Sequence, residues 1–534
     1  MALNPANLAN LPDKLILKIA SQLGIQELSR CIQISHRFHD LLTPDLHLQA
    51  IYHTLGIDRN VLPWAVERQD LALVQNLLEV GRSRFGQDEY RLAIEVAMNQ
   101  RDSNYIRLLL EAGANVSEMD DLNPLHFAAK IGDEKMAQLF IRAGVNLSFS
   151  NVDGETPLYC AVEAGHDTIV QLLIDSGAGV SRPPLLDWFG YTALHHAATK
   201  ANEAVVRALL SAGPNLSAVD DEGRTPLDLA IAEGHIEVIK ELLNAGASLT
   251  QPDWDECTPL HKAADTGNED VVQLLLNFGA DISTPDEFGS TALHIAVTEG
   301  HKDVVKLLFE HGADISLVDE DGATALHHAA DQGNKVVVRL LLDAGANANL
   351  PDDNGWTPLA LAAAEGQEAV TKLLLNTGAD ITSVDGDGWT ALHHAADRGH
   401  TAVVELLLNA GTDASLKTLD GEGALHLAAA EGYEAVVRLL LDAGADISLS
   451  DEKGWTAVHY AAAGGVDALV RRILTQPIEF RAVTPRQETV VRALVRAGAN
   501  VTTLSNDGTS ALQLASEDQN EAMKQLLLSF AKTQ

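Results

Sequence analysis

A short phrase, Thr-Ala/Pro-Leu-His, returns along this chain at a fixed interval of 33 residues. In full or with a single change, it begins at Thr192, Thr225, Thr258, Thr291, Thr324, Thr357, Thr390, Gly423 and Thr456. A fixed interval of this length indicates one supersecondary unit that is repeated and stacked, because a single unit cannot bury its own apolar face. The chain is therefore expected to form an array of units rather than one closed core.

The phrase T-P-L-H-x-A and its interval resemble the ankyrin-repeat family. The resemblance implies an all-α fold, an ankyrin solenoid of about fourteen units, each with two helices and a projecting hairpin finger. Two imperfect units without the phrase are expected in residues 61–119, followed by the array over residues 120–534. Atypical sequence is expected in a terminal unit, because that unit exposes one flank to water or to another domain.

Within a unit, the threonine is expected to cap the first helix, with proline or alanine at the first helical position. An Asp-x-x-Gly sequence, as in Asp319 to Gly322, is expected to form the tight turn before the next threonine. The histidine of the phrase occupies the same place in successive units, as a structural residue does, and each imidazole is expected to hydrogen-bond its own turn: His195, His261, His294, His327, His393, His426 and His459. The additional histidines His196, His328 and His394 are separated by many residues and form no ligand cluster. No nucleophile or phosphate-loop motif appears. We therefore expect no metal, no cofactor and no enzymatic activity.

The charge of the chain bears on its partners. The 534 residues carry a formal net charge of −38, and the negative excess lies in the repeats. Such a surface repels phosphate backbones and anionic lipids, so we expect neither nucleic-acid nor membrane binding. A basic protein partner is favoured, although an acidic surface that only maintains solubility is an equal alternative. Three cysteines and the absence of a signal-like N-terminus indicate a cytoplasmic or nuclear protein.

Residues 8–50 differ from the repeats. Leu11-Pro12 precedes apolar residues at helical spacing, and two more short helices are expected after Gly24. With Ser35, Arg37 and Phe38, this segment resembles an F-box, although Lys14 stands where the family often has glutamate. The resemblance implies a binding site for the Skp adaptor of cullin-based ubiquitin ligases, formed by Leu11, Pro12, Leu15, Ile16, Ile19, Leu23, Leu28 and Ile32. The alternative is a helical cap for the solenoid.

The interval from Thr456 to Ser510 is 54 residues instead of 33. We assign the excess to residues 467–487, which contain two prolines and four arginines in an otherwise acidic array. Two interpretations are open: a functional insertion that loops out of the array, or a retained intron in the gene sequence.

A protein-binding surface is expected on the concave face and finger tips, where the family binds its partners. Large aromatic residues stand just before the phrase at Tyr191, Trp356, Trp389 and Trp455, and such residues are favoured interface anchors when exposed. The alternative is that each tryptophan packs across the neighbouring finger. Carboxylates at the end of the first helix are expected to form a ladder along the groove: Glu163, Glu233, Asp265, Glu299, Asp331, Glu365, Asp397 and Glu431.

These features together predict a non-catalytic interaction protein. The first interpretation is the substrate-recruiting subunit of a Skp–cullin–F-box ubiquitin ligase, a monomer within its complex. The second is a plain ankyrin scaffold whose N-terminal helices only cap the solenoid.

Overall fold

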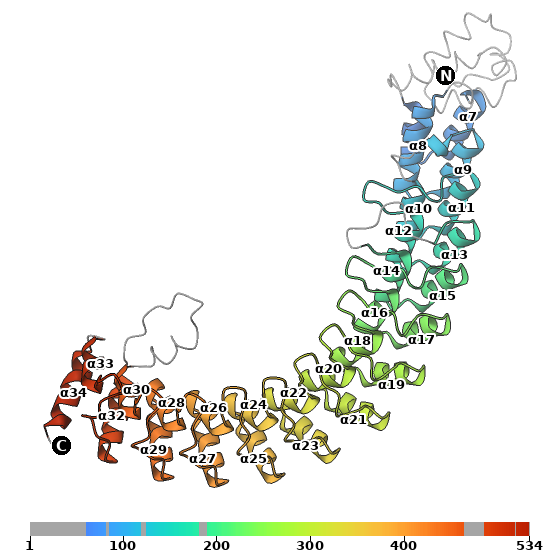
Figure 1. Ribbon diagram of the computed structural model, residues 1–534. Coiled ribbons are helices and arrows are strands. Elements are labelled where there is room, and N and C mark those ends of the chain that lie inside the picture. Colours follow the sequence, from blue (N-terminus) through green and yellow to red (C-terminus); the bar gives the residue numbers. More distant parts are fainter. Residues whose placement is uncertain are drawn as a thin grey trace, which may run out of the picture. The chain divides into compact units, whose positions relative to one another are not determined.

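The computed structural model describes residues 60–81, 85–118, 124–180, 190–463, 485–517 and 520–532. The chain divides into two compact units, unit 1 (Met1–Ser248) and unit 2 (Leu249–Gln534). Within each unit, helix pairs stack one on the next in chain order (Figure 1). Apart from four isolated antiparallel bridges, regular structure in the described residues is helical. The all-α repeat array is thereby confirmed for these residues, and the F-box-like segment lies outside them.

Unit 1 contains six helix pairs in its described residues. The first helices of these pairs are α6 (Val61–Glu67), α8 (Gln87–Asn99), α10 (Pro124–Ile131), α12 (Pro157–Ala164), α14 (Ala193–Thr199) and α16 (Pro226–Ala232). The second helices are α7 (Leu71–Gly81), α9 (Ser103–Glu111), α11 (Glu134–Arg142), α13 (Asp167–Asp175), α15 (Glu203–Ser211) and α17 (Ile236–Asn244). A 3₁₀ helix, Val116–Glu118, follows α9. The imperfect units expected in residues 61–119 correspond to α6 to α9.

Unit 2 contains eight helix pairs, so the described residues hold the fourteen units that were expected. The first helices are α18 (Pro259–Thr266), α20 (Ala292–Thr298), α22 (Ala325–Asp331), α24 (Pro358–Ala364), α26 (Ala391–Asp397), α28 (Ala424–Glu431), α30 (Ala457–Ala463) and α33 (Ala511–Glu517). The second helices are α19 (Glu269–Asn277), α21 (Lys302–Glu310), α23 (Lys335–Asp343), α25 (Glu368–Asn376), α27 (Thr401–Asn409), α29 (Glu434–Asp442), α32 (Pro485–Arg496) and α34 (Glu521–Ala531).

The core of each unit lies between successive helix pairs. In the α22–α23 pair, Ala329 and Ala330 are fully buried, and their small side chains let first helices pack closely on one another. Val337, Val338 and Leu341 of α23 are buried as well and supply the apolar stripe of the second helix. Burial therefore repeats with the sequence unit, and no central core is needed.

The second helix of the interrupted repeat, α32, makes a contact that is also found in an uninterrupted repeat. Gln487, in the first turn of α32, donates its side-chain Nε2–H to the Ala430 carbonyl at 3.0 Å. In an uninterrupted repeat, Gln367 makes the same bond to the Asp331 carbonyl at 3.2 Å. Gln487, the last residue of the predicted insertion 467–487, therefore makes a contact of the repeat. The bounds of the insertion stay a prediction, because most of this segment lies outside the described residues.

Deletion of residues 466–486 should leave the array folded, because Gly465 joined to Gln487 restores the Gly366-Gln367 junction. The free energy of unfolding is expected to stay within about 1 kcal/mol of the native value, since shortening a connecting segment lowers its closure entropy cost only slowly with length. Urea denaturation followed by circular dichroism measures this change. Deletion of the 21 residues 423–443, which span α28 and α29, is the matched control and should unfold the neighbouring repeats.

Candidate protein-binding surface

Most of the described fingers are tight turns held by an aspartate; Asn151, Thr418 and Ser505 take its place in three others. In the finger before α22, Asp319 Oδ1 accepts hydrogen bonds from the backbone N–H of Asp321 (3.1 Å) and of Ala323 (2.8 Å). The Asp319 N–H in turn donates to the Ala323 carbonyl at 3.0 Å. The turn closes through Gly322, whose φ of 74° is left-handed. The sequence prediction of a tight Asp-x-x-Gly turn is confirmed at this finger.

Neighbouring fingers in unit 2 are tied tip to tip by backbone hydrogen bonds. The Phe288 carbonyl accepts from Glu320 N–H at 2.9 Å, and the Asp321 carbonyl accepts from Asp353 N–H at 3.0 Å. The contact is close enough that a Cβ on Gly322 would lie 2.5 Å from Asp353 Oδ1. The same tip-to-tip bond recurs at Asn354–Gly386, Asp387–Leu419, Asp420–Glu452 and Lys453–Asn506. The finger tips of unit 2 therefore form a row with fixed spacing.

The repeated histidine links two units. Thr324 N–H donates to His327 Nδ1 at 3.0 Å, and His327 Nε2 donates to the Trp356 carbonyl of the next unit at 3.2 Å. This pattern uses the neutral Nε2–H tautomer, because Nδ1 acts as an acceptor. Burial lowers the pKa of the His294, His393 and His426 imidazoles to about 4. The predicted hydrogen bond of the histidine to its own turn is confirmed here. The second hydrogen bond, to the next unit, was not predicted from the sequence.

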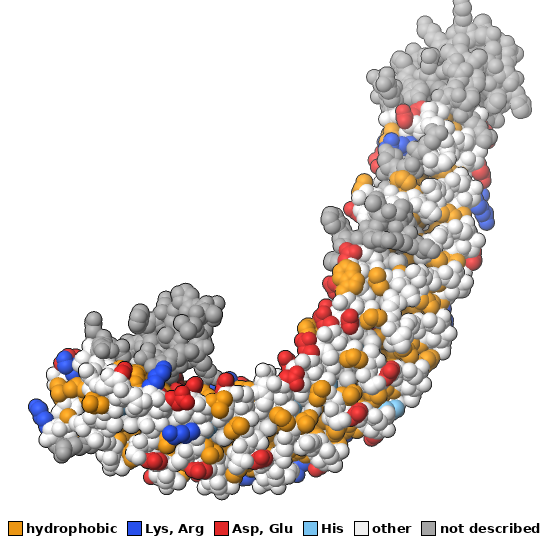
Figure 2. Space-filling view, viewed as in Figure 1, with side chains coloured by type: hydrophobic (Ala, Val, Ile, Leu, Met, Phe, Trp, Pro, Cys, Tyr) orange, Lys and Arg blue, Asp and Glu red, His pale blue; other side chains and the backbone are white. Residues whose placement is uncertain are grey.

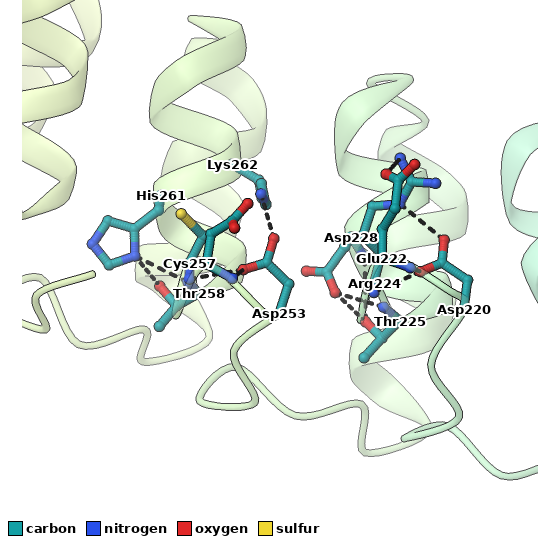
Figure 3. Close-up of polar contacts among 11 residues, drawn as sticks. Asp220, Glu222, Arg224, Thr225, Asp228, Asp253, Cys257, Thr258, His261 and Lys262 are labelled. Atoms are coloured by element: carbon teal, nitrogen blue, oxygen red, sulfur yellow. Dashed lines mark hydrogen bonds and ion pairs between the residues drawn. The ribbon is translucent and has the colours of Figure 1, made fainter. Parts of the chain in front are cut away.

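A second position on the first helix determines which side chain contacts the finger aspartate. In unit 2, Lys262 Nζ lies 2.5 Å from Asp253 Oδ2, and His328 Nε2 lies 2.7 Å from Asp319 Oδ2 (Lys262 in Figure 3). His394 and Tyr460 contact Asp385 and Asp451 in the same way, at 2.9 Å. In the alternate repeats, this position is aliphatic: Leu229, Ile295, Leu361 and Leu427. The array therefore has a two-repeat period that the 33-residue phrase conceals.

Unit 1 contains a substitute for this contact. Its Leu229 cannot pair with the finger aspartate, and Arg224 Nε lies 2.9 Å from Asp220 Oδ2 instead (Figure 3). Asp228, at the place of the repeated histidine, accepts from Thr225 N–H at 2.7 Å and so keeps the helix cap.

The tryptophans expected on an exposed surface are largely buried. Trp389 and Trp455 are each 7% exposed, so their interpretation as exposed anchors is wrong. Trp356 is half-buried, and its ring centroid lies 4.0 Å from that of His394 in the next unit. Tyr191 is half-buried and stacks on His195 at 5.6 Å. These contacts favour the alternative in which the aromatic residues pack between fingers.

The carboxylates occupy two positions rather than one. Asp265, Asp331 and Asp397 lie in the last turn of α18, α22 and α26, whereas Glu299, Glu365 and Glu431 fall one residue later in their own repeats. In unit 2, Asp265, Glu299 and Glu365 are exposed and the other three are half-buried. Glu163 and Glu233, in unit 1, are exposed.

Neighbouring carboxylates of the two positions interact. Burial raises the pKa of the Asp331 carboxyl, and the negative charge of Glu365 raises it further. Arg398 pairs with Glu365 and partly neutralises it. The predicted ladder of carboxylates therefore alternates between two positions. One of its members, Glu365, is paired with Arg398 of the array itself.

The exposed aromatic residues lie at the finger tips. Trp254 is 68% exposed and Phe288 is 56% exposed. These two residues are not among the predicted anchors, because the predicted anchors stand directly before the threonine. Trp254 and Phe288 stand four and three residues before it. Both lie among acidic residues, and Figure 2 shows Asp and Glu side chains gathered on the finger side of α18, α20 and α22. Aromatic and acidic groups together suit a basic partner segment.

The predicted adaptor-binding residues, Leu11 to Ile32, lie outside the described residues. Among those described, no group of three or more His, Cys, Asp or Glu side chains is arranged to hold a metal ion. None of the described helices has the length and apolar character required to cross a membrane.

Comparison with known proteins identifies the repeats. A family model of ankyrin repeats, spanning three copies, matches residues 93–184, 179–253, 249–319, 311–385 and 380–451. These matches run without a gap from residue 93 to residue 451, which is more than half of the chain. No curated protein matches the chain.

Proposed function

Because this chain belongs to the ankyrin-repeat family, a family of protein-interaction modules, we propose that it is the substrate-recruiting subunit of a Skp–cullin–F-box ubiquitin ligase. Residues 11–38 would bind the Skp adaptor, and the repeats would hold the protein to be modified. The observation that carries this proposal is the order of the two parts: an F-box-like motif directly followed by an interaction array. Such a subunit needs no catalytic residue, since it contributes proximity between substrate and transferring enzyme.

The substrate would bind to the finger side of the repeats. The tip-to-tip hydrogen bonds of unit 2 keep the fingers in register, so the surface is largely preorganised, and preorganisation lowers the entropy cost of binding. The exposed rings of Trp254 and Phe288 replace Trp389 and Trp455 as the anchors. Asp265, Glu299 and the partly paired Glu365 remain in the proposal as the acidic component.

The second candidate is a scaffold without an adaptor site. It is favoured by Lys14, which departs from the F-box pattern. In that case the N-terminal helices would serve only as a cap for the first repeats.

Recovery of a purified Skp adaptor with the full-length chain separates the two candidates. Leu11→Asp or Ile19→Asp should reduce recovery more than about tenfold, because a carboxylate buried without a partner in an apolar interface costs several kcal/mol. Leu419→Asp is the matched control, since Leu419 is 70% exposed at a finger tip, and it should leave recovery unchanged. If the native chain recovers no adaptor, the ligase proposal fails and the scaffold stands.

A further inference from the structure

A groove of about 640 Å³ lies in unit 2 along α18, α20 and α22 and the fingers that precede α20 and α22. Its rim carries the exposed ring of Phe288. Six carboxylates and one lysine line it: Asp265, Asp286, Glu299, Asp319, Glu320, Asp321 and Lys262. The groove is therefore strongly acidic and has one aromatic wall.

The finger aspartate at the centre of the groove differs from those on either side. Asp253 is paired with Lys262 at 2.5 Å, and Asp319 is paired with His328 at 2.7 Å. At Asp286 the corresponding helix position is Ile295, which carries no charge. Asp286 Oδ1 accepts backbone N–H bonds from Phe288 (3.0 Å) and Ser290 (2.8 Å), as in the other fingers.

Among the described residues, none forms an ion pair with the Asp286 carboxylate, and the lysine of the groove, Lys262, is paired with Asp253. Asp265, Asp286 and Glu299 form no ion pair within the described part of the chain. In the flanking repeats, Oδ2 of the finger aspartate accepts the Lys262 ammonium or the His328 Nε2, so the geometry of the finger accommodates a nitrogen donor there. The middle repeat thus keeps the acceptor and lacks the donor.

The histidine that lines the same groove differs from its counterparts too. His261 is 2% exposed, and its Nε2 has no hydrogen-bond partner among the described residues. In the next repeat, His294 Nε2 donates to the Leu317 carbonyl at 3.1 Å. The His261 ring faces the backbone of Thr284 and Ser290 without reaching a hydrogen-bond geometry. The finger before α20 therefore lacks one of the bonds that secure the others.

We propose that this groove binds an arginine side chain from an extended basic segment of the partner protein. The guanidinium would lie beside the Asp286 carboxylate, in the place that Lys262 and His328 fill in the flanking repeats, with its plane against the Phe288 ring. Arginine fits better than lysine, because its planar fork pairs with carboxylates in a bidentate manner and stacks on aromatic rings. The proposal rests on the assignment of the repeats as the substrate-holding part.

The test places a positive charge beside Asp286 by a substitution in the chain itself. Ile295→Lys places an ammonium at the position of Lys262 and should occupy Asp286. The probe is a fluorescent nine-residue peptide with arginine at every third position, separated by Gly-Ser, and its binding to the full-length protein is measured by anisotropy. Ile295→Lys should weaken binding at least about tenfold, which corresponds to the loss of one charge-assisted contact. Phe288→Ser should weaken it about fivefold through loss of the ring.

Matched controls separate the groove from general charge effects. Val336→Lys adds the same charge at a position that is 55% exposed on α23, and Phe278→Ser removes an aromatic ring that is 41% exposed outside the groove. Both should change affinity less than twofold. If Val336→Lys weakens binding as much as Ile295→Lys does, attraction is non-specific and the proposal is overturned. Should Ile295→Lys prevent folding, Asp286→Asn provides the same test without a charge in the helix.

Peptide chemistry tests the choice of arginine. The lysine version of the peptide should bind about fivefold more weakly, and the glutamine version should not bind measurably. Equal affinity for the lysine and arginine versions contradicts the arginine assignment. Recovery of the Skp adaptor is independent of these variants, so failure of the groove and failure of the ligase proposal give different results.

Discussion

Alanine at Trp389 should lower the free energy of unfolding by about 3–5 kcal/mol, the range for removal of a buried tryptophan. The ring is 7% exposed and lies 5.1 Å, between centroids, from the His394 ring. His394 is itself buried and bonded to Asp385 in the same finger. Loss of the indole therefore opens a cavity beside a buried polar pair. Urea denaturation followed by circular dichroism measures the loss.

Trp254→Ala is the matched control. This ring is 68% exposed, so its removal should change the free energy of unfolding by less than about 0.5 kcal/mol. A small loss for Trp389→Ala, equal to that of Trp254→Ala, would show that the two rings are equally accessible and would restore Trp389 as an anchor. If the expected difference is found, loss of partner capture in Trp389→Ala reports unfolding, and only Trp254 and Phe288 variants report contact.

The repeat was predictable because its signals are local. A threonine that caps a helix and an Asp-x-x-Gly turn use residues a few positions apart, and both are found at the positions that the phrase predicts. The number of repeats followed from the same interval. These features need no information about what lies across the interface between repeats.

The binding surface was less predictable because it depends on the neighbouring repeat. Trp356 and Trp389 occupy the same place in the sequence unit, yet one is half-buried and the other buried. Both rings lie near His394. A histidine occurs at this helix position at His328 and His394, whereas the repeats that follow each of them have Leu361 and Leu427. The alternation between polar and aliphatic residues can be seen in the sequence at Lys262, Ile295 and His328. Its role becomes clear only from the structure, in which Lys262 and His328 contact the finger aspartate.

Mild acid should destabilise the array because the repeated histidines are buried in their neutral form. Burial lowers the pKa of His294, His393 and His426 to about 4, whereas an unfolded histidine has a pKa of about 6.5. Between these values the unfolded chain binds more protons, so the free energy of unfolding falls as the pH falls from about 6.5 toward 4. This stability is fully present only above the unfolded pKa. From pH 7 to 5, each of the three should contribute a loss of about 2 kcal/mol.

Acid also has a stabilising effect that opposes this loss, so the free energy of unfolding has to be measured in a pH range where the histidines dominate. Acid also protonates carboxylates and relieves the repulsion of a chain with a net charge of −38, but most carboxylates titrate below pH 5. The free energy of unfolding, measured with urea at pH 7, 6 and 5, should therefore decrease over this interval. A value that stays constant or rises would mean that charge repulsion outweighs the histidines.

A single substitution isolates the histidine contribution. At Ser510, the place of the repeated histidine is taken by Gln513, whose Oε1 accepts the backbone N–H of Ser510 at 2.7 Å. His426→Gln should therefore keep the cap at Gly423 while removing the titrating group. The variant should lose about 2 kcal/mol less than the native protein between pH 7 and 5. A slope equal to that of the native protein would rule out His426 as a source of the pH dependence.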